Sequence, residues 1–144
     1  MHTLMDDACV HSWMMHALNK EPDANMARHA RRCVASRIPH RGRANYSLVQ
    51  RRLLLHADHC SSHMSALVEI ENGEEWIPES LGLLYADQGR LSEAEAMYTR
   101  ALQGYVKAWG PEHVSTLHTV NGLGNLYSDQ GWLSEAEAIY NRAL

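Results

Sequence analysis

Apolar residues in the C-terminal half of the chain recur every three or four positions, which is the period of an amphipathic α-helix. Between residues 91 and 105 this apolar stripe consists of Leu91, Ala94, Met97, Tyr98, Ala101, Leu102 and Tyr105. A pattern just before it predicts a helix from about Trp76 to Gln88, and a matching helix is expected from about Thr116 to Gln130. We therefore expect an all-α fold in which helices come in consecutive pairs.

Glycine and proline mark where these helices should end. Gly89 and Gly131 follow the first helix of each pair, at the position where a helix commonly closes with a left-handed residue. Gly110 and Pro111 follow the second helix of the first pair. They predict a break at that point, because neither residue favours the continuation of a helix.

Short polar residues mark where the helices should begin. Ser92 and Ser134 are each followed three residues later by a glutamate, Glu95 and Glu137, which is the pattern of a reciprocal capping box. The sequence therefore predicts Ser92 and Ser134 as the N-caps of the second helices. Ser115 is predicted to cap the helix that follows the glycine–proline break.

The two helix pairs are copies of one unit. Residues 81–102 read LGLLYADQGRLSEAEAMYTRAL, and residues 123–144 read LGNLYSDQGWLSEAEAIYNRAL. Seventeen of these 22 positions are identical at an offset of 42 residues, so the chain contains an internal repeat.

Small and aromatic residues within each unit predict how its helices pack. Gly82 and Ala94 lie on apolar faces, where their lack of bulk lets two helices approach closely. Tyr85 and Tyr98 are expected to fill the space beside them. The second unit repeats this set as Gly124, Ala136, Tyr127 and Tyr140. One helix pair cannot bury its apolar face alone, so the units must stack.

The order Leu-Gly-x-x-Tyr, followed by Ala, an aromatic residue and Ala, resembles the signature of tetratricopeptide repeats. The matching positions, which pack the repeat, are Leu81, Gly82, Tyr85, Ala94, Tyr98 and Ala101 and then Leu123, Gly124, Tyr127, Ala136, Tyr140 and Ala143. Pro78 and Val120 stand where the signature has tryptophan. The period of 42 residues and the linker from Gly110 to Leu117 look like the kinesin light chain subtype. The resemblance implies helical hairpin repeats that form an α-solenoid.

The same resemblance implies where partners would bind. In tetratricopeptide arrays the first helix of each pair lines a concave face that holds peptides of partner proteins. Carried over position by position, the groove candidates are Glu79, Leu83 and Asp87 in the first unit and His118, Asn121, Asn125 and Asp129 in the second. Asn121 falls where kinesin light chains carry the first of two asparagines, and Gly122 replaces the second. The implied function is a protein–protein interaction scaffold without a cofactor, whose partner proteins or peptides the sequence does not identify.

The predicted array occupies residues 71–144, with a first repeat at about 75–115 and a second, truncated repeat at about 117–144. The sequence shows no polar capping helix after this second repeat, although about three repeats are usually needed for stability. We therefore expect a piece of a longer protein. Self-association through the unfinished repeat end is a further expectation.

Residues 1–70 form a separate helical region in the sequence pattern. Helices are expected at about residues 3–18, 22–36 and 46–63, with a loop between the last two. In the second of these helices, the expected apolar face is Met26, Ala30, Cys33 and Val34, and the opposite face is Arg28, Arg31 and Arg32. In the third, the expected apolar face is Val49, Leu53, Ala57 and Cys60.

A second resemblance concerns the start of the chain. Met1-His2-x-Leu4 followed by Val10-His11-x-Trp13 looks like the end of the winged-helix module in fungal nucleotide-switch receptors. These receptors are NACHT or NB-ARC signalling ATPases, and many continue into repeats of this 42-residue kind. In that family a Met-His pair senses the phosphate of the nucleotide, which would make His2 its counterpart. The chain has no G-x-x-x-x-G-K-[ST] loop, so no ATPase activity is expected from it.

Charge divides the chain and raises two alternatives. Residues 1–55 carry nine basic and four acidic side chains, whereas the remainder carries four basic and thirteen acidic ones. The eight arginines between residues 28 and 52 could contact nucleic-acid phosphates, but aromatic residues are scarce among them. The side chains of His56, His59, Cys60 and His63 share one helical face. Four ligands along one helix cannot converge tetrahedrally on Zn²⁺, so a metal site is not the favoured interpretation. Nucleic-acid binding is not favoured either, because aromatic residues are scarce among the arginines.

Other functional classes lack sequence support. The longest aliphatic run is three leucines, far short of a membrane helix, and no secretory signal is present. The three cysteines are widely spaced and form no C-x-x-C pair. No ordered nucleophile–base constellation occurs, so we do not expect an enzyme. We expect a cytoplasmic interaction protein, either the repeat part of a signalling receptor or a stand-alone adaptor similar to kinesin light chains.

Overall fold

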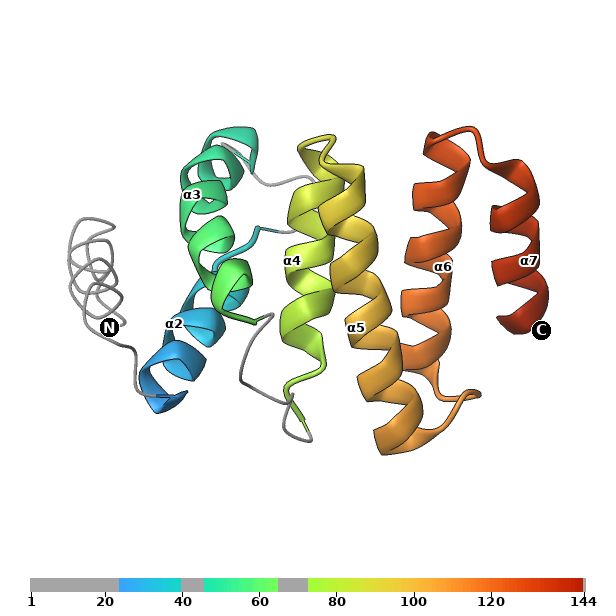
Figure 1. Ribbon diagram of the computed structural model, residues 1–144, viewed down its shortest axis with the longest axis horizontal. Coiled ribbons are helices and arrows are strands. Elements are labelled where there is room, and N and C mark those ends of the chain that lie inside the picture. The colour runs from blue at the N-terminus through green and yellow to red at the C-terminus, as the bar shows by residue number, and fades with distance from the viewer. Residues whose placement is uncertain (1–23, 40–45, 65–72, 144) are drawn as a thin grey trace. The chain divides into compact units, whose positions relative to one another are not determined.

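The computed structural model describes residues 24–39, 46–64 and 73–143, and within these ranges it contains six α-helices and no strand (Figure 1). The helices are α2 (Ala24–Ser36), α3 (Tyr46–Met64), α4 (Trp76–Asp87), α5 (Leu91–Trp109), α6 (Val114–Asp129) and α7 (Leu133–Ala143). The all-α prediction is confirmed. The chain divides into two compact units, Met1–Val68 with α2 and α3, and Glu69–Leu144 with α4 to α7.

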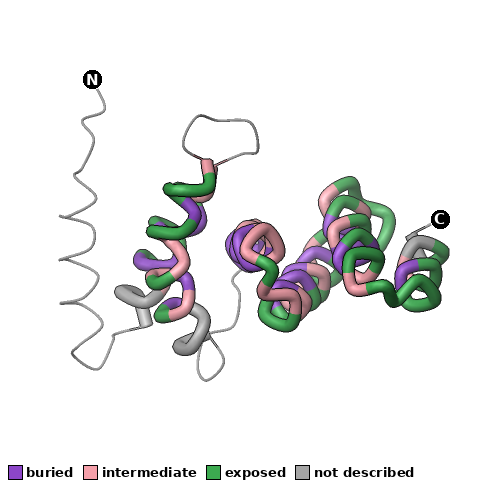
Figure 2. Tube along the Cα trace, turned by 90° about the horizontal axis from the view of Figure 1, so that it is seen from above, coloured by how far each residue is buried: buried purple, intermediate pink, exposed green. Residues whose placement is uncertain are grey.

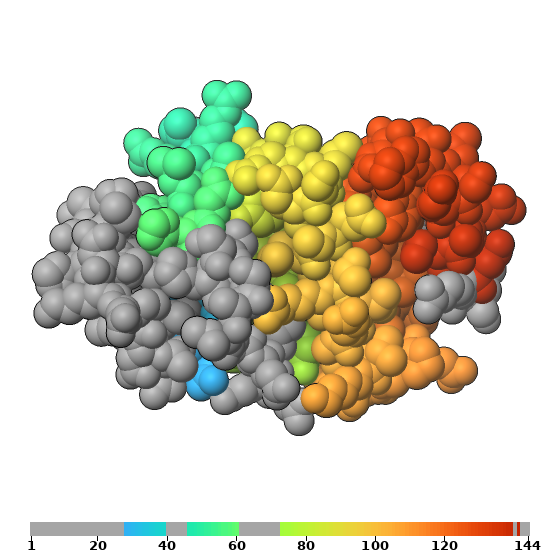
Figure 3. Space-filling view, in the orientation of Figure 1, coloured from blue at the N-terminus to red at the C-terminus, as the bar shows by residue number. Residues whose placement is uncertain are grey.

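The second unit consists of two helical hairpins that lie side by side. Each helix packs against the next along the chain, and α4 also contacts α6 across the unit (Figure 1). Buried residues run along one side of α5 and α6 and exposed residues along the other (Figure 2). The side chains of α5 largely hide α4 in the space-filling view, so this view shows mainly the side of the second helices (Figure 3). The arrangement matches the expected helical repeat fold.

The repeat-packing positions form the core of this unit. Nine of them are buried: Leu81, Gly82, Tyr85, Ala94, Tyr98, Ala101, Leu123, Gly124 and Ala136. Tyr127 is partly exposed, and its hydroxyl donates a hydrogen bond of 2.6 Å to Oε1 of Glu95 on α5. The side chains of Tyr140 and Ala143 lie outside the described residues. Aliphatic and tyrosine side chains thus fill the space between the helices, where small residues leave room for them.

The predicted helix ends at glycine are confirmed. Gly89 and Gly131 have φ angles of 74° and 77°, and Gly110 has a φ of 88° immediately after α5. The amide of Arg90 donates to the carbonyl of Tyr85 at 2.9 Å, and the amide of Gly89 donates to that of Ala86 at 3.0 Å. These two bonds form a Schellman motif, in which the left-handed residue satisfies carbonyls at the end of the helix.

The predicted capping boxes at Ser92 and Ser134 are wrong. The helix α5 begins at Leu91 with Arg90 as its N-cap and no side-chain cap, so Ser92 lies inside the first turn. Ser134 likewise lies within α7, which begins at Leu133. The reason is the tight Schellman turn, after which the next helix begins only two residues beyond the left-handed glycine. The guanidinium of Arg90 instead pairs with Glu93 at 2.7 Å.

The prediction of Ser115 as an N-cap is also wrong. The N-cap of α6 is His113, whose Nδ1 accepts a hydrogen bond of 3.2 Å from the amide of Ser115. Thr116 closes the same turn, because its Oγ1 donates to the carbonyl of Gly110 at 2.8 Å. An imidazole nitrogen therefore serves where a hydroxyl was expected.

The first unit contains α2 and α3, and the structure corrects the predicted faces of both helices. Ala30 and Val34 of α2 are buried as expected, but Cys33 is exposed and Arg31 is buried. Arg31 precedes both Val34 and the buried Ala35, by three and four positions, so it lies within the buried stripe, whereas Cys33 lies on the far side of that stripe. On α3, Ala57 and Cys60 are buried as expected, Leu53 is partly exposed, and Gln50 rather than Val49 continues the buried stripe. The side chain of Met26 lies outside the described residues.

Candidate functional site

The groove candidates form one stripe on α4 and one on α6, and none of them is a repeat-packing residue. Glu79, Leu83 and Asp87 on α4 are partly exposed, at a spacing of four residues. His118, Asn121, Asn125 and Asp129 on α6 are exposed, at spacings of three and four residues. Residues at these spacings share one side of a helix. We call the surface formed by these seven residues, all of them groove candidates from the sequence, the α4/α6 face.

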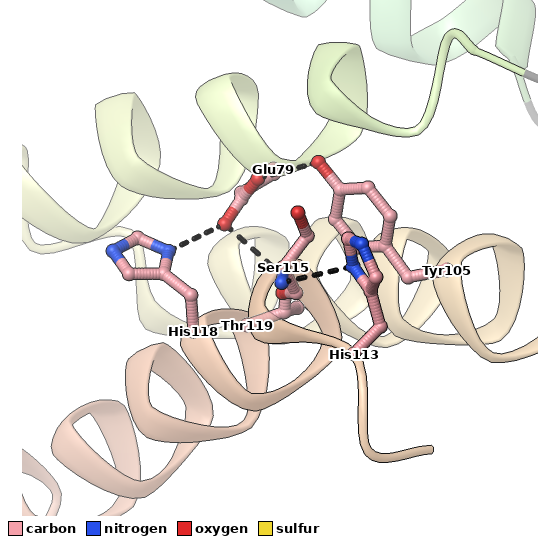
Figure 4. Close-up of polar contacts among 6 residues, drawn as sticks. All are labelled: Glu79, Tyr105, His113, Ser115, His118 and Thr119. Carbon is pink, nitrogen blue, oxygen red and sulfur yellow. Dashed lines mark hydrogen bonds and ion pairs between the residues drawn. The ribbon is translucent and has the colours of Figure 1, made fainter. Parts of the chain in front are cut away.

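A carboxylate joins the two stripes. Oε1 of Glu79 lies 2.8 Å from Nδ1 of His118 and accepts a bond of 3.2 Å from Oγ1 of Thr119, both on α6 (Figure 4). Its Oε2 accepts a bond of 2.7 Å from the hydroxyl of Tyr105 on α5. Since a carboxylate only accepts hydrogen bonds, Nδ1 of His118 carries the hydrogen in this contact. Glu79 therefore ties α4 to both neighbouring helices.

The environment of this carboxylate is partly sheltered from water. The side chain of Glu79 is only 19% exposed, whereas that of His118 is 77% exposed. Thr119 is fully buried, and its Oγ1 lies 3.0 Å from the carbonyl of Ser115, so its one hydroxyl hydrogen is shared between this carbonyl and Glu79. Burial, followed by the hydrogen bond to Glu79, raises the pKa of Tyr105 well above its usual value. Tyr105 consequently stays protonated and remains a hydrogen-bond donor to Glu79 at neutral pH.

Sequence reasoning missed the partners of Glu79. Thr119 was not distinguished from other polar residues of α6, and Tyr105 was assigned only to the apolar stripe of α5. One signal was available, because Glu79 and Asn121 occupy the same position in the two repeats but differ in charge. A carboxylate that is present in the first repeat and absent from the second indicates a contact made by the first repeat alone.

A row of aromatic rings continues from this site along the end of α5. The rings of Tyr105 and Trp109 are stacked, with centroids 5.5 Å apart, and those of Trp109 and His113 are 4.5 Å apart. Trp109 is half exposed. The row supports the turn that leads into α6, since His113 at its end is the N-cap of that helix.

Gly122 owes its identity to packing. A Cβ atom at Gly122 would lie 3.2 Å from Cε1 of Tyr98, and one at Gly82 would lie 3.1 Å from Cγ and Cδ1 of the same ring. The ring of Tyr98 is therefore held between α4 and α6 by one glycine from each helix. An asparagine in place of Gly122, as the kinesin light chain pattern has, would collide with this ring unless it moved.

The metal alternative gains no support from the described residues of α2 and α3. His56 is partly exposed, His59 is exposed and Cys60 is buried, while the side chain of His63 is outside the described residues. In the described ranges no three histidine, cysteine or acidic side chains are grouped to hold a metal ion. Burial raises the pKa of the Cys60 thiol to about 11, against a smaller opposite effect of Arg31.

His2 and the rest of the chain start lie outside the described residues, so the structure adds nothing to the second resemblance. None of the helices in the described ranges is long and apolar enough to cross a membrane.

A comparison with known protein families supports the repeat assignment of α4 to α7. A family model described as tetratricopeptide repeat matches residues 74–144, which include all four helices of the two hairpins. No curated protein and no solved structure gave a significant match. The match supports a tetratricopeptide repeat protein. Such repeats generally mediate protein–protein interactions, and proteins that carry them are typically scaffolds without enzymatic activity.

Proposed function

We propose, from the tetratricopeptide repeat match over residues 74–144, that the chain binds peptide segments of partner proteins on its α4/α6 face. The observation that carries the proposal is that packing residues and exposed polar residues lie on different sides of these helices. The inward sides hold the repeat-packing residues, whereas the outward side of α6 carries two exposed residues with amide side chains, Asn121 and Asn125.

The two asparagines suit the recognition of a peptide backbone. An amide side chain offers both a donor and an acceptor, so it can pair with a backbone carbonyl and a backbone amide of the same residue. Asn121 and Asn125 lie one helical turn apart and therefore point to the same side. Leu83, which is partly exposed on α4, adds an apolar side chain to the α4/α6 face.

The hydrogen bonds of Glu79 support the proposal by fixing how α4 and α6 lie relative to each other. A binding face built from two helices is useful only if the helices keep one spacing, because ordering them upon binding would reduce the affinity. Three hydrogen-bonding groups from α5 and α6 converge on the Glu79 carboxylate and hold that spacing before a partner arrives.

Peptide display against the purified full chain tests the proposal. Peptides are selected from a random library and their affinities are then measured by fluorescence anisotropy for the chain and for Asn121→Ala/Asn125→Ala. A hydrogen bond contributes about 1 kcal/mol net, so the loss of two or more bonds should weaken binding by roughly 30-fold. Ser92→Ala, on the exposed side of α5, is the matched control and should leave binding unchanged.

Two results would count against the α4/α6 face. One is that the selected peptides bind the double asparagine variant as tightly as the unchanged chain. The other is that Ser92→Ala weakens peptide binding as much as the double asparagine variant does, because the loss would then not be specific to the α4/α6 face.

We further propose that this face belongs to the repeat part of a cytoplasmic signalling receptor rather than to a stand-alone adaptor of the kinesin light chain kind. The support is the combination of a 42-residue repeat with the Met1-His2 motif at the chain start. The flanking genomic DNA tests it. An upstream reading frame with a phosphate-binding loop is expected, and its absence would favour the adaptor.

Self-association through α7 is proposed as well. The exposed side chains of Trp132 and Leu133 at the beginning of this helix favour it. Size-exclusion chromatography over a range of chain concentrations should show a shift towards the dimer, and a constant elution volume would contradict it.

A further inference from the structure

The α4/α6 face differs in charge from the helices around it. Both α4 and α6 contain carboxylates (Glu79, Asp87 and Asp129) but no lysine or arginine. The basic side chains described in this unit are Arg90, Arg100 and Lys107, which belong to α5 and to the turn before it. Arg90 is in addition occupied, since it pairs with Glu93 and lies over the ring of Tyr85 at 4.9 Å.

We infer that the peptide segment held by the α4/α6 face is extended and carries lysine or arginine side chains. This inference rests on the proposed peptide binding and adds the chemistry of the partner. A face with three carboxylates and no lysine or arginine repels an acidic segment. The same carboxylates attract a basic one.

The spacing of the polar residues supports an extended segment. Residues four positions apart on a helix have their Cβ atoms about 5–6 Å apart. Alternate residues of an extended chain are roughly 6.6 Å apart, because the rise is about 3.3 Å per residue. Asn121, Asn125 and Asp129 follow one another at four-residue steps along α6, a spacing similar to that of alternate residues in an extended chain. Backbone groups of alternate peptide residues can therefore meet the two amides in turn, while a basic side chain reaches the carboxylate one turn further.

Helix α4, in the first repeat, offers the same chemistry. Leu83 and Asp87 are also one turn apart, and both are partly exposed on α4. The aliphatic stem of a lysine or arginine can lie along an apolar side chain while its charged end reaches a carboxylate. Leu83 followed by Asp87 provides this combination, which a neutral or acidic peptide could use only in part.

Three labelled peptides of equal length test the inference against the purified full chain by fluorescence anisotropy. The first alternates lysine with valine, the second replaces each lysine by glutamate, and the third replaces each lysine by glutamine. We expect the lysine peptide to bind at least tenfold more tightly than the glutamate peptide at low salt. The difference should shrink at high salt, because exposed charges are screened.

Charge-neutral variants separate this face from the general acidity of the protein. Exposed ion pairs typically change affinity by about twofold to fivefold each, so Asp87→Asn/Asp129→Asn should weaken the lysine peptide by roughly tenfold. The control is Glu112→Gln/Glu137→Gln, which removes the same charge from exposed positions outside α4 and α6. It should change binding by less than about twofold.

Each outcome decides between the two proposals. Tighter binding of the glutamate peptide, or an equal loss in the control pair, would overturn the inference about charge. If the peptides that do bind still depend on Asn121 and Asn125, the proposed function stands. If no peptide depends on these asparagines, the proposed function itself fails.

Discussion

Replacing Gly122 with alanine is expected to destabilise the protein, although alanine favours helices more than glycine does. The substitution places a methyl group 3.2 Å from Cε1 and 3.3 Å from Cζ of Tyr98, where carbon atoms prefer about 3.5–4.0 Å. The ring has little room to move, because Gly82 on α4 lies equally close to it and Tyr98 is only 6% exposed.

The expected size of the effect is the difference between two opposing terms. Inserting a methyl group into a tightly packed position costs about 1–3 kcal/mol. Helix propensity returns about 1 kcal/mol when glycine becomes alanine. We therefore expect Gly122→Ala to lower the free energy of unfolding by about 1 kcal/mol, and Gly82→Ala to do the same. The double variant should lose more than the sum of the two by about 1 kcal/mol, because the ring is then pressed from both sides.

Urea titration followed by circular dichroism measures these differences. The decisive measurement is a change of sign. In a Tyr98→Leu background the ring is absent, so Gly122→Ala should stabilise the protein by up to about 1 kcal/mol through helix propensity alone. Ser128→Ala, at an exposed position of the same helix, reports the propensity effect without any contact to Tyr98. Stabilisation by Gly122→Ala in the unchanged protein would show that the ring is not clamped.

Three other predictions concern single groups. Glu79→Gln should lower the free energy of unfolding by about 2 kcal/mol in urea titrations, because three hydrogen-bonding groups lose a charged acceptor, and a loss below about 0.5 kcal/mol would contradict its joining role. The hydrogen bond to Glu95, followed by burial, raises the pKa of Tyr127 from its ordinary 10.0 to about 12. The stability that this tyrosine contributes is therefore present below pH 10 and is lost as the pH rises towards about 12. Ultraviolet absorbance of tyrosinate should show this late titration, and Tyr127→Phe should remove it. Burial raises the pKa of Cys60 to about 11, so iodoacetamide at neutral pH should alkylate the exposed Cys33 much faster in the folded chain. Peptide mapping by mass spectrometry measures both rates, and equal rates would refute the burial of Cys60.

The repeat region was predictable because its signals are local. Identical residues at an offset of 42 establish the unit, and the left-handed glycines after α4 and α6 follow from a conformation that other residues avoid. The N-caps were not predictable from the serine pattern. A Schellman turn fixes the next helix start through backbone hydrogen bonds, and these outweighed the side-chain preference of Ser92.

Burial in the first unit was predicted only in part, for a different reason. Apolar periodicity identifies the side of a helix to within about one residue, since neighbouring positions differ by about 100° around the axis. Long polar side chains such as Arg31 and Gln50 can share the buried side, which hydrophobicity alone does not reveal.

The sequence by itself determined that this protein has helical hairpin repeats, where their helices end and which small residues lie in the core, because these properties depend on neighbours along the chain. Only the tertiary structure showed that Gly122 packs against the ring of Tyr98 and that Glu79 joins α4 to α5 and α6. These pairs are 24 to 40 residues apart in sequence, and their contacts depend on how the hairpins stack. Stacking brings distant side chains within hydrogen-bonding range, and no periodicity along the chain records that distance.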